Sequence, residues 1–132
     1  MYPRFFITAI LIGFWINAAA QYSFNVKKSF SESSHLVYFA KYDDEGKYII
    51  TTGSDNSVII WNAEKGTIHR TLAGLKDRQN IALFSPDKSF LFSAGLGNNI
   101  TIWNPNTGTI TATLKGHSGA VKALAVSPDG KY

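Results

Sequence analysis

The side chains in this sequence that could perform acid–base or metal chemistry are three histidines and one run of carboxylates. His35, His69 and His117 are far apart along the chain, and the acids at residues 43–45 lie in an Asp-Asp-Glu-Gly segment typical of a turn. Metal sites need clustered histidine, cysteine or carboxylate ligands, and no such spacing occurs. We therefore expect no catalytic residue, no metal site and no cofactor.

Two further motifs resemble binding or modification sites. The Gly-Leu-Gly segment at residues 95–97 is no phosphate loop, because no Lys-Ser or Lys-Thr pair follows it. Asn99 and Thr101 form a glycosylation acceptor, but a turn asparagine that precedes a strand explains this pattern equally well. The chain has no cysteine, which excludes a disulfide framework and a catalytic thiol.

Composition narrows the classes of partner. The chain has 132 residues, of which 45% are hydrophobic and 17% charged, and this favours one folded domain over disorder. Its net charge of +4 is spread along the sequence, with one adjacent basic pair at Lys27 and Lys28. Nucleic-acid-binding proteins carry clustered Lys and Arg, so we expect no nucleic-acid partner.

The first 20 residues are typical of an export signal. Arg4 precedes an uncharged run at residues 5–16, and the small residues Ala18 and Ala20 predict cleavage before Gln21. The run is short for a membrane span, which needs about 20 apolar residues. We predict a cleaved signal-peptide helix over 1–20, a secreted or periplasmic protein, and no membrane contact after cleavage. An uncleaved membrane anchor and a buried core helix are the alternatives.

The rest of the chain repeats itself at a spacing of 42 residues. Trp61 and Asn62 recur as Trp103 and Asn104, and Ser-Pro-Asp at residues 85–87 recurs at 127–129, with no gap. A fixed period of this length is typical of repeat architectures.

Each 42-residue unit contains four short apolar segments separated by turn residues. The second and third segments are near-continuous apolar runs, which indicates burial on both faces, whereas the fourth alternates as a half-exposed outer strand does. The expected strands are 36–42, 48–52, 58–61 and 67–72 in the first unit, 80–84, 90–94, 100–103 and 109–114 in the second, and 121–126 in a third. This pattern predicts an all-β propeller built of four-stranded antiparallel blades.

These motifs resemble the WD-repeat family of β-propellers. The resemblance rests on Gly116 and His117, on the Ser-Pro-Asp turns, and on the Trp-Asn pairs that stand where the family has Trp-Asp. It implies two complete repeats and the start of a third, with blades at 34–75 and 76–117 and a partial blade at 118–132. The segment 21–33 precedes them and contains an outer closing strand at 25–30, which by resemblance pairs with a blade near a distant C-terminus.

The resemblance also implies a polar network that links a histidine, a Ser or Thr on the second strand, an Asp in the next turn, and the Trp. The first unit matches with Thr51 or Thr52, Asp55 and Trp61, but has Ser33 at the histidine position; the second matches with Ser93 and Trp103, but has Leu75 and Gly97 at the histidine and aspartate positions; the third begins with His117. We expect these residues to be structural.

The expected function follows from the resemblance. WD-repeat propellers mainly bind proteins or peptides, so we expect a non-catalytic, exported scaffold for protein–protein interaction with a protein or peptide partner. An alternative is the N-terminal propeller of a larger exported enzyme, a peptidase or hydrolase, whose catalytic domain lies beyond residue 132. A cytosolic scaffold is a third possibility. Because propellers use about 4–8 blades, we also expect the sequence to be a fragment.

Overall fold

A computed structural model describes residue 30 and residues 36–132, and in this part of the chain the fold is all-β. Its strands are β1 (Val37–Tyr42), β2 (Tyr48–Gly53), β3 (Val58–Asn62), β4 (Thr67–Leu72), β5 (Gln79–Phe84), β6 (Leu91–Gly95), β7 (Ile100–Asn104) and β8 (Thr109–Leu114). The expected strands of the first two units are confirmed, each to within one residue at either end.

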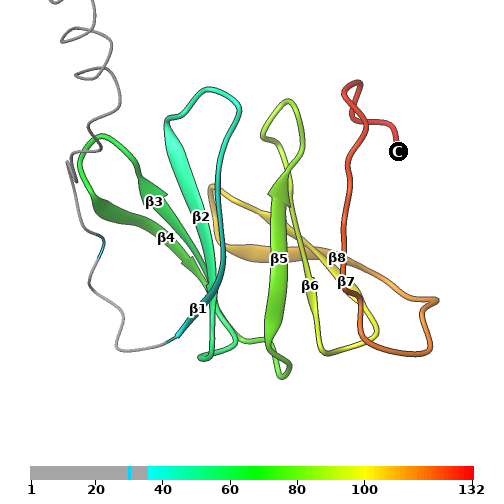
Figure 1. Cartoon of the computed structure of the whole chain (residues 1–132). Helices are drawn as coiled ribbons and strands as arrows, with labels where there is room; N and C mark the ends of the chain where they lie inside the picture. Colours follow the sequence, from blue (N-terminus) through cyan, green and yellow to red (C-terminus); the bar gives the residue numbers. More distant parts are fainter. Residues whose placement is uncertain (1–29, 31–35) are drawn as a thin grey trace, which may run out of the picture.

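The strands form two four-stranded antiparallel sheets, ordered β1-β2-β3-β4 and β5-β6-β7-β8. Figure 1 shows the two sheets side by side, with β1 and β5 as neighbouring inner strands. The turns at 43–46 and 85–88 lie at one end, which we call the turn end. The connection at residues 73–78 between β4 and β5 lies at the other, which we call the connector end. This arrangement confirms the blade architecture expected for the first two units.

The repeat extends to irregularities in the strands. The register shifts between Val37 and Phe39 in the first sheet and between Gln79 and Ile81 in the second. A second shift, opposite the tryptophan, occurs between β3 and β4 and again between β7 and β8. Bulges bend and twist strands, so their equivalent positions give the two sheets the same local twist.

The hydrophobic core lies between the two sheets. Ile50, Val58, Ile60 and Leu72 of the first sheet pack with Ala82, Leu91 and Trp103 of the second in one cluster of buried residues. Removal of this apolar surface from water is the main favourable contribution to folding. The sequence predicts half-exposed outer strands, and the structure shows them to be more exposed than that. Every residue of β4 except Leu72 is exposed, and β8 is exposed along its whole length.

The prediction of a strand over residues 121–126 is wrong for this structure. No described segment pairs with these residues as a neighbouring strand, and Val121 bonds through its N–H to the Gly95 carbonyl at 2.9 Å. A β-strand requires a ladder of hydrogen bonds to a partner strand. The residues that follow form a turn at 127–130, as the sequence predicts.

The predicted signal helix, its cleavage site at Ala18, Ala20 and Gln21, and the predicted closing strand at 25–30 lie outside the described residues, apart from Phe30. The ring of Phe30 packs edge-on against Trp61 with 5.6 Å between ring centres. Within the described residues, the structure contains no helix long and apolar enough to cross a membrane.

Candidate functional site

Each blade is held internally by a tryptophan that donates a hydrogen bond to a hydroxyl on the neighbouring second strand. Trp61 Nε1 donates to Thr51 Oγ1 at 2.8 Å, and Trp103 Nε1 donates to Ser93 Oγ at 2.9 Å. Both tryptophans are buried, so these bonds satisfy polar groups that would otherwise be desolvated. The partner in the first blade is Thr51, while the Thr52 hydroxyl is buried with no hydrogen-bond partner.

The asparagines that follow the tryptophans close the next turn. Asn62 Oδ1 accepts from the Lys65 N–H at 2.8 Å, and Asn104 Oδ1 accepts from the N–H groups of Asn106 and Thr107 at 3.0 and 3.2 Å. Asparagine side chains commonly stabilise turns through bonds of this kind. Both residues therefore have local structural roles.

The aspartate position of the network differs between the blades. Asp55 accepts from the Ser57 hydroxyl at 2.7 Å and so orders the turn between β2 and β3. In the second blade this position is Gly97, and a Cβ placed there would lie 2.6 Å from Asp77 Oδ2. A carboxylate from the connection 73–78 thus occupies the space beside Gly97, which the repeat alignment does not predict because the residue equivalent to Asp77 in the first unit is a histidine, His35.

The two described histidines, His69 and His117, lie in separate places, and His35 lies outside the described residues. His69, on β4, stacks at a tilt on Tyr48 with 4.9 Å between ring centres. His117 and Gly116 are exposed, and the structure records no bond from the His117 side chain. Within residue 30 and residues 36–132, no group of three or more His, Asp or Glu side chains is placed to hold a metal ion.

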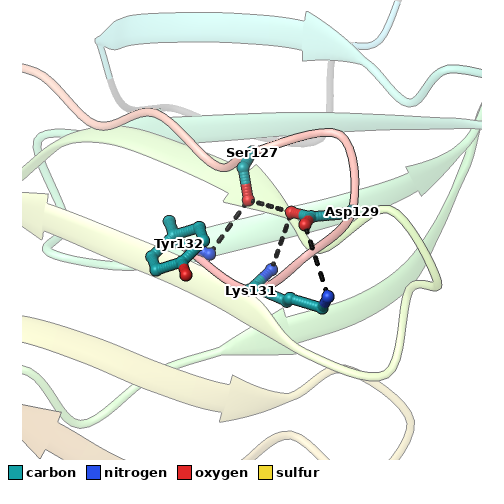
Figure 2. A network of polar contacts seen from close by, with 4 residues as sticks. All are labelled: Ser127, Asp129, Lys131 and Tyr132. Atoms are coloured by element: carbon teal, nitrogen blue, oxygen red, sulfur yellow. Dashed lines mark hydrogen bonds and ion pairs between the residues drawn. The ribbon is translucent and has the colours of Figure 1, made fainter.

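The first residue of each turn between the first and second strand fixes that turn with its side chain. Ser85 Oγ accepts from the Phe90 N–H at 3.0 Å, and Ser127 Oγ accepts from the Tyr132 N–H at 2.9 Å. Figure 2 shows the latter together with the bond from Ser127 to Asp129. In the first blade the equivalent acceptor is Asp43 Oδ1, which accepts from the Tyr48 N–H at 2.8 Å.

This change from serine to aspartate creates an ion pair between the blades. Lys88 Nζ lies 2.6 Å from Asp43 Oδ2 and 2.7 Å from Glu45 Oε2, and the Asp43 side chain is only 1% exposed. Burial alone would raise the pKa of the Asp43 carboxyl. The hydrogen bonds from Lys88 and from the Tyr48 backbone, with the lysine charge, outweigh burial and hold this pKa below its ordinary value.

Lys88 has a left-handed backbone conformation that residues other than glycine rarely adopt. Its φ is +58°, whereas the equivalent positions are Gly46 at +70° and Gly130 at +71°. A residue with a Cβ is disfavoured in this region by steric contact with its own backbone. The ion pairs with Asp43 and Glu45 offset that strain, and they raise the pKa of the Lys88 ammonium.

The inner strands and the third unit enclose a cavity at the turn end. Its volume is about 490 Å³, and its walls include Tyr42 and Asp44 from the first blade, Pro86 and Lys88 from the second, and residues 124–126 from the third unit. Aromatic, acidic and basic groups of the first two units and apolar side chains of the third therefore meet around one opening. Such a mixed lining suits polar and apolar contacts with a peptide.

The fold and the internal network define a class of protein, the β-propeller built of repeated four-stranded blades. A family model described as "WD domain, G-beta repeat" matches residues 24–62, 70–104 and 108–132, about three quarters of the chain. The chain belongs to this WD-repeat family.

One solved structure illustrates the fold. The chain is similar to the crystal structure of the WD40 repeats of RRP9, with a TM-score of 0.64 and 19% identity. The similarity covers 70% of this chain and 30% of that one. No curated protein sequence matches the chain.

Proposed function

We propose that this chain is part of an exported, non-catalytic scaffold that binds a protein or peptide partner. Membership of a repeat family whose propellers generally mediate protein–protein interaction supports the binding role. The observation that carries the proposal is the turn-end cavity, where three units contribute side chains to one opening of about 490 Å³. Tyr42, which lines it, is 57% exposed and offers an aromatic contact surface.

Site-specific crosslinking tests the location of binding. A photo-crosslinking amino acid at Tyr42 in the full chain, expressed in its own host, should give one discrete adduct. The same substitution at Thr111, which is exposed on β8, is the matched control and should give none. Equal adducts from both positions would contradict binding at the turn end.

The export part of the proposal is supported by the sequence of residues 1–20. Mass spectrometry of the mature protein should find Gln21 at the N-terminus. A protein that retains Met1 and stays in the cytosol would contradict export without affecting the binding proposal, and one that retains residues 1–20 in the membrane fraction would replace cleavage by anchoring.

A further inference from the structure

The connector end carries basic side chains that the proposed binding at the turn end does not use. Lys122 is one of them. It holds the same position in its unit as Asn80 and Tyr38 hold in the second and first units, because these residues are spaced by 42 residues. Lys76, Arg78 and Lys115 lie at this end as well. Against these cations the connector end has two acids, Asp55 and Asp77, among the described residues, while six acids lie at the turn end: Asp43, Asp44, Glu45, Glu64, Asp87 and Asp129.

Arg78 is held in a defined orientation. Its guanidinium carbon lies 4.3 Å from the centre of the Tyr38 ring, and its Nε donates to Asn80 Oδ1 at 3.2 Å. The ring is part of the first blade and Asn80 part of the second, so the guanidinium spans the junction between blades. One N–H of the five is used, and the terminal N–H groups form a fork that matches a carboxylate.

Lys122 lies on the segment of the third unit that is bonded to the same blade as Arg78. The Arg78 carbonyl accepts from the Leu96 N–H, and the Gly95 carbonyl accepts from the Val121 N–H, each at 2.9 Å. Gly95 and Leu96 are consecutive residues of the second blade. Leu96 bonds to the segment that contains Arg78, and Gly95 bonds to the segment that contains Lys122. Among the described residues, neither Arg78 nor Lys122 forms an ion pair with a carboxylate.

We infer that the connector end is a second binding surface, one for an acidic peptide segment of a protein partner whose carboxylates contact Arg78 and Lys122. The preoriented guanidinium loses little freedom on binding, which favours a planar, bidentate ligand. A peptide is favoured over nucleic acid because nucleic-acid affinity comes mainly from many Lys and Arg contacts to phosphates, and the basic groups here are few. This inference goes beyond the proposed function, which uses the opposite end.

Fluorescence anisotropy with a labelled hexaglutamate peptide tests the surface on the full chain at low salt. The double substitution Arg78→Gln with Lys122→Gln should weaken binding by about tenfold or more, because both charged contacts are lost. The control Lys65→Gln with Lys131→Gln removes the same charge at the turn end and should change binding by less than about twofold. Arg78→Lys should fall between the wild type and the double variant, since it keeps the charge and loses the fork.

Several outcomes would overturn the inference. Absence of hexaglutamate binding by the wild type, or equal losses in both double variants, would show that no localised site exists. Tighter binding of a single-stranded oligonucleotide, lost in the same connector-end variants, would replace the peptide by nucleic acid. If Arg78→Gln shifts the urea midpoint, Lys122→Gln alone decides, because Lys122 is exposed and its substitution leaves the fold intact; unchanged binding by that variant would exclude the lysine contact.

Discussion

Lys88 of the second repeat contacts Asp43 of the first at 2.6 Å, from a left-handed backbone position that the other two turns give to glycine. The contact joins the two blades at the turn end, next to the candidate binding cavity. Breaking it should therefore affect both the junction and the shape of that opening.

Lys88→Met should destabilise the chain by about 1–3 kcal/mol, because it leaves the buried Asp43 Oδ2 without its partner. Urea denaturation measures the loss. The double variant Asp43→Ser with Lys88→Gly recreates the serine and glycine of the third turn and should recover most of it. A double variant less stable than Lys88→Met would contradict both the cost of the unpaired Asp43 carboxylate and the relief of backbone strain at residue 88.

Trp103→Ala should lower the free energy of unfolding by about 3–5 kcal/mol, since Trp103 is fully buried in the core between the sheets. Chemical denaturation followed by circular dichroism gives the value. Tyr132→Ala removes an aromatic ring that is 89% exposed and serves as the control, with an expected change within about 0.5 kcal/mol. A small effect at Trp103 would place it outside the cooperative core.

Stability should fall as the pH is lowered from about 4 toward 2. Hydrogen bonds from the Ser85 and Ser89 hydroxyls lower the pKa of the Asp87 carboxyl to about 2, below its ordinary 3.8. The contribution of Asp87 is thus complete above the ordinary value and is lost as the pH falls through the lowered one. Urea midpoints measured across this range should decline less steeply in Asp87→Asn, and identical slopes would show that Asp87 is not involved.

Gly95→Ala should be destabilising by about 1–3 kcal/mol or more, because its Cβ would lie 1.8 Å from the Arg78 carbonyl oxygen and force the backbone to move. Gly119→Ala is the matched control, since a Cβ there meets nothing within 4 Å. Thermal unfolding compares the two. If Gly95→Ala is tolerated, the Arg78 carbonyl lies farther from residue 95 than it does in this structure.

The sequence predicted the elements that recur and missed the contacts that do not. The bounds of β4 and β8 follow from the 42-residue period, because equivalent turns delimit equivalent strands. The Asp43–Lys88 pair and the position of Asp77 beside Gly97 depend on residue types that change from one repeat to the next, so the period alone does not predict them. The expected strand at 121–126 failed for another reason: strand formation depends on a partner, which local pattern does not encode.

The pair between Asp43 and Lys88 also gives the junction a direction. If the two units exchanged places, Ser85 would stand opposite Gly46 at their junction, and neither of these residues carries a charge. The two blades have the same fold, yet the ion pair forms only when the unit with Asp43 precedes the unit with Lys88. The succession of units is therefore itself encoded in the side chains at their boundary.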